Sequence, residues 1–177
     1  APEPRAETPD GALELPGHVQ HVGIVGSPTI NQLYAAVCAP GTDARETVGA
    51  FLLFVRTAAE MDALVKRMSA SKLRVGRLAS SVRSTERVSV LSKLARGRVH
   101  FLVATDVASR GLDLRKLTHV VNMSPAANAI EYMHRAGRVG RMDRPGTVLT
   151  ICRTDEERVG LQQIADELGV ADDMVLM

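Results

Sequence analysis

The sequence has 177 residues, a length that suits a single domain, and it is 45% hydrophobic and 24% charged, as expected of an ordinary globular protein. Aromatic residues make up only 3% and tryptophan is absent, which excludes base stacking on aromatic side chains as a main mode of nucleic-acid binding. The formal net charge is +2, and no apolar run approaches the length of a membrane-spanning helix.

The small net charge hides an uneven distribution. Residues 72–115 contain ten Lys or Arg against three acids, whereas residues 154–177 contain seven acids against Arg158. The basic middle could bind a polyanion. Amphipathic helices with solvated basic faces would give the same count, and charge alone favours this second interpretation.

The first half of the chain alternates between strand-like and helical patterns. Residues 1–16, with four prolines and four acids, are predicted to be a linker. Strands are predicted at 18–25 and 50–55, the second buried on both faces because AFLLFV is continuously apolar. Between them we expect a helix over 28–39, with Pro28 at its first position, and a loop over 40–49. A helix should follow Thr57, which is a plausible N-cap with Glu60 as its capping-box partner.

The second half repeats this alternation. Strands are predicted at 74–79, 99–105, 117–123 and 146–151. Helices are predicted at 84–97, 128–138 and 155–168, the first capped by Ser84 or Thr85 and stopped by Gly97. Regular β–α alternation predicts a three-layer α/β/α fold with a mainly parallel sheet.

In such sheets ligands gather at the carboxyl ends of the strands. Three segments directly follow predicted strands: Thr57, residues 105–113 and the loop 124–128. We therefore expect all three to open on the same edge of the sheet.

The two cysteines, Cys38 and Cys152, lie far apart in apolar runs and show no metal-ligand spacing. We expect both to be small buried side chains of a protein in a reducing, intracellular compartment. The sequence predicts no metal site.

The segment EYMHRAGRVGR, residues 131–141, gathers fixed positive charge around two glycines. On a helix, His134, Arg138 and Arg141 would share one face and Arg135 would point elsewhere. Because Gly137 and Gly140 are unfavourable inside a helix, we expect them to let a ligand or partner approach the backbone. Paired guanidinium groups match the geometry of phosphoryl oxygens. A basic helix end that complements its own macrodipole would explain one arginine, but not three.

The segment TDVASRGLD, residues 105–113, offers a hydroxyl, two carboxylates and an arginine around a glycine. Such a turn could contact a phosphate backbone, and one carboxylate could bind a ribose. Alternatively, Asp106 caps the next turn and Asp113 pairs with Arg110. No GxxxxGK[ST] phosphate loop occurs, so this chain alone is predicted not to hold a nucleoside triphosphate firmly.

Together these segments carry a family resemblance. From about residue 14 to 169 the chain resembles the C-terminal, RecA-like domain of DEAD-box RNA helicases of superfamily 2. LVATDVASRGLD resembles motif V, YMHRAGRVGR resembles motif VI, FLLFVRT resembles motif IV, and LPGHVQHVGI resembles the usual entry into this domain. His134 at the head of motif VI favours DEAD-box proteins over related groups. Residues 17–177 would then form the helicase C-terminal domain, and residues 1–16 the linker from a preceding domain.

The resemblance implies a role for each matching residue. Arg138 and Arg141 would be arginine fingers on the ATP γ-phosphate, with His134 linking two domains in the closed state. Asp113 would bind the ribose and Gly111 would lie near the phosphates. The residues of the RNA side would be Thr105 and Thr57 as phosphate contacts and Arg110 and Arg87 as organisers of that surface. Asp106 would position an arginine, for which Arg135 is the candidate.

The implied activity is that of an RNA-dependent ATPase and RNA helicase, of which this chain is the second catalytic lobe. ATP with Mg²⁺ would be held mainly by an absent N-terminal RecA-like domain, so this chain alone is expected to be inactive. The implied partners are that domain, RNA bound by its backbone without strong sequence preference, and possible protein cofactors; no membrane is implied.

The chain departs from the family pattern mainly on the RNA side. Ala79 and Ser80 stand where the family usually has His-Gly, Ser84 stands in place of a Gln, and Leu94 in place of an aromatic residue. Ser124 also replaces an Asp before a proline. These departures leave open an alternative: a non-catalytic RNA-binding or scaffold protein that retains the helicase fold.

Overall fold

A computed structural model describes the chain over residues 15, 18–29, 32, 49–79, 81, 83–109, 114, 116–140 and 144–177. The predicted linker, the predicted helix over 28–39 and the predicted loop over 40–49 lie outside these residues except at Leu15, Pro28, Thr29, Gln32 and Gly49. Cys38 lies outside them as well.

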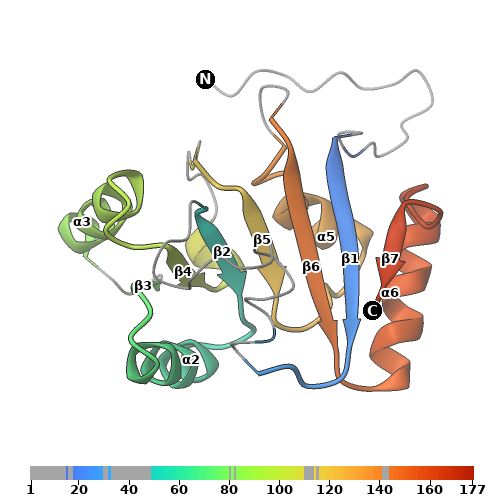
Figure 1. The fold of residues 1–177 in the computed structure, drawn as a ribbon, viewed down its shortest axis with the longest axis horizontal. Helices are drawn as coiled ribbons and strands as arrows, with labels where there is room; N and C mark the ends of the chain where they lie inside the picture. The colour runs from blue at the N-terminus through green and yellow to red at the C-terminus, as the bar shows by residue number, and fades with distance from the viewer. Residues whose placement is uncertain are drawn as a thin grey trace.

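Seven parallel strands form the sheet of the described chain, in the order β3-β4-β2-β5-β6-β1-β7 (Figure 1). The strands are β1 Val19–Val25, β2 Phe51–Phe54, β3 Val75–Leu78, β4 Phe101–Ala104, β5 His119–Asn122, β6 Gly146–Cys152 and β7 Met174–Leu176. Because every pair is parallel, all strands end at one edge of the sheet, at the bottom of the view in Figure 1.

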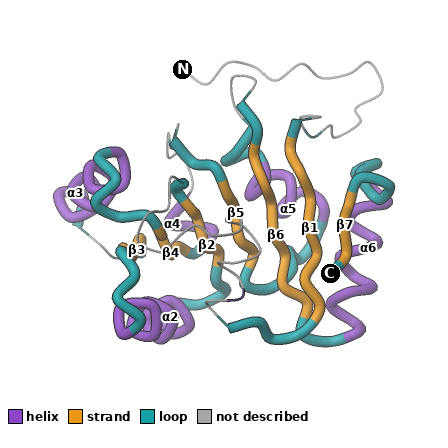
Figure 2. The backbone as a smooth tube through the Cα atoms, viewed as in Figure 1, coloured by secondary structure: helices purple, strands orange, loops and turns teal. Residues whose placement is uncertain are grey.

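In the described part of the chain, five helices connect or follow the strands (Figure 2): α2 Ala58–Ala70, α3 Ser84–Ala95, α4 Asp106–Ser109, α5 Ala129–Ala136 and α6 Asp155–Glu167. Two apolar clusters show how they cover the sheet. Met61, Leu64 and Met68 of α2 pack in one cluster, whereas buried residues of α3, α4, α5 and α6 pack in the other. The expected three-layer α/β/α arrangement is therefore confirmed.

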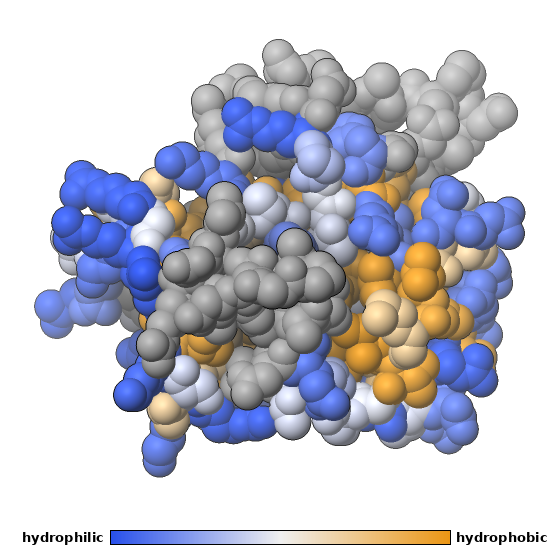
Figure 3. All heavy atoms as spheres, viewed as in Figure 1, coloured by the Kyte–Doolittle hydropathy of each residue, from blue (hydrophilic) through white to orange (hydrophobic). Residues whose placement is uncertain are grey.

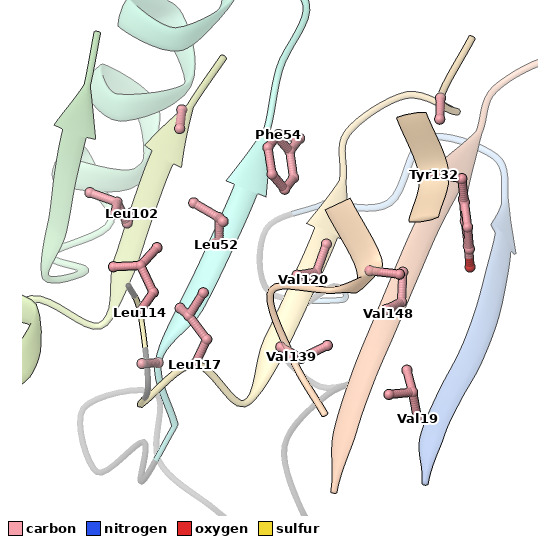
Figure 4. Packing of buried hydrophobic residues seen from close by; sticks show 14 of the residues in the cluster. Val19, Leu52, Phe54, Leu102, Leu114, Leu117, Val120, Tyr132, Val139 and Val148 are labelled. Atoms are coloured by element: carbon pink, nitrogen blue, oxygen red, sulfur yellow. The ribbon is translucent and has the colours of Figure 1, made fainter. Parts of the chain in front are cut away.

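Strand β2 shows why the sheet holds both layers. Phe51 and Leu53 point into the cluster under α2, while Leu52 and Phe54 point into the opposite cluster (Figure 4). All four side chains are at least 95% buried. The continuous apolar run thus forms a central strand buried on both faces, as predicted.

Two local predictions need correction. Helix α3 begins at Ser84 with Arg83 as its N-cap, and no side chain caps it, so neither Ser84 nor Thr85 has the expected role. Strand β7 was not predicted, because its three residues follow an acidic turn and two of them are exposed. It forms only by pairing with β1, a long-range contact that local sequence does not encode.

Candidate functional site

Three segments that the sequence analysis predicts to share one edge lie at the carboxyl edge of the sheet. Thr57 follows β2, Thr105 follows β4, and the loop 124–128 follows β5. Since β4, β2 and β5 are consecutive neighbours in the parallel sheet, the prediction of a common edge is confirmed.

Thr57 is the N-cap of α2, as predicted. Its Oγ1 accepts a hydrogen bond from the backbone N–H of Glu60 at 3.1 Å. The Glu60 carboxylate accepts in return from the backbone N–H of Arg56 at 3.0 Å, one residue before the position of a standard capping box. Because the threonine oxygen acts as an acceptor in the cap, its O–H remains able to donate to an anion. The side chain is exposed, so a ligand can reach it.

Asp106 and Arg135 join the two most distinctive segments of the sequence. The Arg135 guanidinium donates to both Asp106 carboxylate oxygens, from Nε at 2.8 Å and from Nη2 at 2.7 Å. Nη2 also donates to Glu131 at 2.5 Å, and the guanidinium lies over the Phe54 ring, 5.1 Å from its centroid. Arg135 is only 3% exposed. It therefore anchors α5 to the turn that follows β4 and does not face solvent.

A buried polar chain continues from Arg135 across three strands. Arg135 Nη1 donates to Asn122 Oδ1 at 3.3 Å, and Asn122 Nδ2 donates to Thr150 Oγ1 at 3.0 Å. Thr150 hydrogen-bonds with Tyr132, whose hydroxyl lies 2.8 Å from His21 Nδ1. These hydrogen bonds link β5, β6, α5 and β1, so they fix the position of α5 on the sheet.

Burial shapes the ionisation of this polar chain. It lowers the pKa of His21 from 6.5 to about 4, an effect that nearby Asp173 opposes. Burial also raises the pKa of the Tyr132 phenol. Both side chains are therefore neutral near pH 7. Among these hydrogen-bonded side chains, charge lies only at the end near Arg135.

The arginine segment is not one continuous helical face. Helix α5 ends at Ala136 with Gly137 as its C-cap, and Arg138 lies in the following turn, where its N–H donates to the carbonyl of Arg135 at 3.1 Å. His134 is exposed and lies in the last turn of the helix, whereas Arg138 is half-buried. The predicted shared face of His134 and Arg138 is thus wrong in detail, because the helix ends between them. The expectation that Arg135 points elsewhere is confirmed.

Gly140 has a structural reason to be glycine. Its φ of +70° lies in the left-handed region, and a Cβ there would lie within 3.4 Å of His18 Nε2 and in closer contact with Val19. The segment passes here beside the start of β1, at the opposite end of the sheet from Asp106. The expected role in admitting a ligand is therefore not needed to explain Gly140.

Arg87 connects the neighbouring helix to the same turn. From the first half of α3 its Nη2 donates to the carbonyl of Ala108 in α4 at 2.8 Å. Ser109 closes that short helix by donating from Oγ to the carbonyl of Asp106 at 2.9 Å. The turn after β4 is thus held from one side by Arg135 and from the other by Arg87.

Four predicted site residues lie outside the described residues: Arg110, Gly111, Asp113 and Arg141. The alternative pairing of Asp113 with Arg110 lies there too. Asp106 does not cap the turn as the alternative interpretation held: it is the first residue of α4, and its carboxylate binds Arg135.

Sequence reasoning missed the residues that support the site from within: Glu131, Asn122, Thr150, Tyr132 and His21. Polar residues inside otherwise apolar strand patterns were the available signal, since buried polar groups need partners. Two of the strand residues, Asn122 and Thr150, are fully or almost fully buried.

Over the described ranges, no three His, Cys, Asp or Glu side chains are grouped so that they could hold a metal ion. In the same part of the chain no helix has the length and apolarity needed to cross a membrane. Cys152 is buried, and burial raises the pKa of its thiol to about 11.

Comparison with known proteins supports the resemblance read from the motifs. The family model for the helicase conserved C-terminal domain matches residues 30–143. The DEAD-box ATP-dependent RNA helicase CshC of Bacillus cereus is 32% identical over 117 residues, which cover 66% of this chain and 30% of CshC. ATP-dependent RNA helicase p62 of Drosophila melanogaster is 37% identical over 105 residues, 59% of this chain and 15% of p62. The chain thus spans less than a third of each relative.

Solved structures share the fold. The C-terminal domain of the DEAD-box protein Dbp5 matches with a TM-score of 0.74 at 22% identity, over 90% of this chain and 89% of that domain. The yeast DEAD-box splicing factor Prp28 matches with a TM-score of 0.75 at 21% identity, over 90% of this chain and 35% of Prp28. S. cerevisiae Dbp5 bound to RNA and ADP BeF3 matches with a TM-score of 0.74 at 20% identity, over 93% of this chain and 42% of Dbp5.

Proposed function

Since the chain belongs to the helicase conserved C-terminal domain family, in its DEAD-box branch, we propose that it is the second catalytic lobe of an ATP-dependent RNA helicase or ribonucleoprotein remodeller. One observation carries the proposal beyond the family: the Asp106–Arg135 ion pair joins the motif V segment to the motif VI segment. The two segments that would serve RNA and nucleotide are thereby parts of one rigid unit.

On the nucleotide side, Arg138 and Arg141 would bind the γ-phosphate and His134 would contact the N-terminal RecA-like domain. Asp113 would accept hydrogen bonds from the ribose, with Gly111 close to the phosphates. Guanidinium groups fit phosphate oxygens and not a metal ion, so Mg²⁺ would be held by the other lobe together with most of the ATP. The arginines neutralise charge that develops on the phosphoryl group during transfer.

On the RNA side, the Thr57 O–H and Thr105 would donate to backbone phosphates at the carboxyl edge. Arg87 and Arg110 would hold that edge in shape, a role that the Arg87 contact with Ala108 supports. Contacts of this kind position a strand without reading its bases. Closure of two lobes around ATP would then strain RNA held on one rigid edge and open a short duplex.

The test is ATP hydrolysis by the full-length protein, with and without RNA. RNA should raise turnover, and Arg138→Ala should abolish the RNA-stimulated part, because a missing arginine finger costs roughly a thousandfold or more in kcat. Arg158→Ala is the matched control, since Arg158 is also half-buried but lies on α6. The 177-residue chain alone should show no turnover, since it lacks the other half of the site.

A scaffold that retains the fold is the second candidate. The changed residues at 79–84 favour it, because α3 begins there without a side-chain cap, on the side that would meet RNA. If RNA and Arg138→Ala both leave turnover unchanged, the catalytic proposal fails and the scaffold remains.

A further inference from the structure

A group of basic side chains lies at the amino edge of the sheet, opposite the proposed RNA site. We call it the amino-edge basic surface and define it as Lys72, Arg74, Lys93, Arg96, Arg98 and Lys116. These residues precede β3, β4 and β5 or lie at the end of α3, and all six are exposed. Because the strands are parallel and neighbouring, their starting points meet at one edge.

Hydrogen bonds hold part of this surface around the C-terminus of α3. Arg74 Nη1 donates to the carbonyl of Gly97 at 3.1 Å, and Lys116 Nζ donates to the carbonyl of Ala95 at 2.7 Å. Cations at this end complement the helix macrodipole, which explains Arg74 and Lys116. The same effect applies to Lys93 in the last turn of α3 and to Arg96 at its C-cap, but it does not explain why Lys72 and Arg98 gather at the same place.

Between positions 72 and 116, the described acids and most of the described basic residues lie toward opposite edges of the sheet. The two described acids between residues 72 and 116, Glu86 and Asp106, lie at the start of α3 and directly after β4, both toward the carboxyl edge. No described acid lies between Arg87 and Thr105, so the described residues that join α3 to β4 at the amino edge carry only basic charge. Six of the nine described basic residues between 72 and 116 thus lie at the end of the sheet away from Thr57 and Thr105.

The surface has the chemistry of a polyanion site and lacks that of a protein interface. Protein interfaces are anchored by buried apolar and aromatic side chains. Among the described exposed apolar residues, Val88 is the one on α3, and it lies in the first half of that helix, away from the C-terminal turn. In Figure 3 hydrophilic residues cover the left of the view, over α3, while the largest group of apolar residues lies right of centre.

We propose that the amino-edge basic surface binds the phosphate backbone of RNA that extends beyond the strand held at the carboxyl edge, such as a flanking duplex. This inference rests on the proposed function, which supplies RNA as the substrate. Exposed Lys and Arg side chains recognise phosphates by charge, so binding here would be independent of sequence and sensitive to salt.

The test compares two RNAs bound to the full-length protein by fluorescence anisotropy at several salt concentrations. One is a single strand of about ten nucleotides, within the range of single-strand site sizes. The other carries the same strand joined to a duplex of about 16 base pairs, the span of a double-strand-binding domain. The variant is Lys93→Gln/Arg96→Gln/Arg98→Gln, which spares the side chains that bond α3.

For the longer RNA we expect the triple variant to lower the magnitude of the slope of log K against log salt by about 2 to 3, since each phosphate contact contributes roughly 0.7 to 0.9. Affinity at low salt should fall roughly tenfold or more. Binding of the short strand should not change. The control, Arg77→Gln/Arg158→Gln, removes charges that lie on β3 and at the start of α6, away from the amino edge, and should retain the wild-type slope.

A wild-type slope for the triple variant on the longer RNA overturns the inference, and so does an equal loss in the control. Failure of the proposed function looks different, because the wild-type protein would then bind neither RNA. Wild-type binding of the short strand with no extra affinity for the longer RNA would overturn this inference alone.

Discussion

Replacement of Arg135 by methionine tests the buried network that holds α5 on the sheet. The substitution keeps a long apolar side chain but removes the guanidinium that binds Asp106, Glu131 and Asn122. Removal of one partner from a buried ion pair costs about 3–5 kcal/mol. The two carboxylates here are 32% and 31% exposed, so water can partly replace the lost partner. We expect a loss near the lower end, about 3 kcal/mol.

The assay is urea unfolding followed by circular dichroism, since the chain has no tryptophan to report fluorescence. A loss of about 3 kcal/mol corresponds to a fall in Tm of roughly 6–12 °C for a chain of this size. Arg158→Met, at the surface, should stay within about 0.5 kcal/mol of wild type. A double-mutant cycle with Asp106→Asn should show coupling of about 1 kcal/mol or more.

A loss below about 1 kcal/mol for Arg135→Met would refute the reasoning. Arg135 would then be free to act as a ligand contact, because its buried bonds would not be needed for the fold. Additive effects of Arg135→Met and Asp106→Asn would likewise contradict a direct role for their ion pair.

Three further outcomes are expected. His21 has a folded pKa of about 4 against 6.5 when unfolded, so the unfolded state takes up the proton first, and stability should fall by about 2–3 kcal/mol from pH 7 to pH 4.5 in urea titrations. Gly140→Ala should lower the free energy of unfolding by about 1 kcal/mol or more, because φ is +70° and the new Cβ would contact Val19. Thr57→Ala and Thr154→Ala should each cost about 1 kcal/mol as lost caps, but only Thr57→Ala should weaken RNA binding in anisotropy assays.

Each of these has its own control. His21→Phe should flatten the acid dependence; a steep profile in His21→Phe would assign the effect to another group. Gly137→Ala should cost far less than Gly140→Ala, because φ at Gly137 is −66°. Equal RNA affinity of the two threonine variants would remove Thr57 from the proposed contacts.

Periodicity predicted most of the described fold because its central elements depend on simple patterns. The run AFLLFV is apolar on both faces and became β2, and Thr57 with Glu60 marked the start of α2. The predicted ends of the strands were enough to predict which residues lie together at the carboxyl edge. These features follow from local composition and from the geometry of parallel sheets, so no tertiary information was needed.

The parts that sequence did not predict depend on partners far along the chain. Strand β7 forms only against β1, and Gly140 packs beside Val19 at the start of β1. The buried bond between His21 and Tyr132 joins residues 111 positions apart. Hydrophobic pattern cannot indicate such pairs, because a polar residue in a strand has the same appearance whether its partner is water or a tyrosine.

The position of β1 between the last two strands affects how the molecule is made. Val19 to Val25 pairs with Gly146 to Cys152 on one side and with β7 on the other. During synthesis the first strand therefore has no described neighbour until the last strands have left the ribosome. Pairing over such a separation is slow and leaves strand edges exposed meanwhile. A nascent chain that has been synthesised only as far as residue 145 would thus present β1 without β6, and we expect chaperones to bind it until β6 is made.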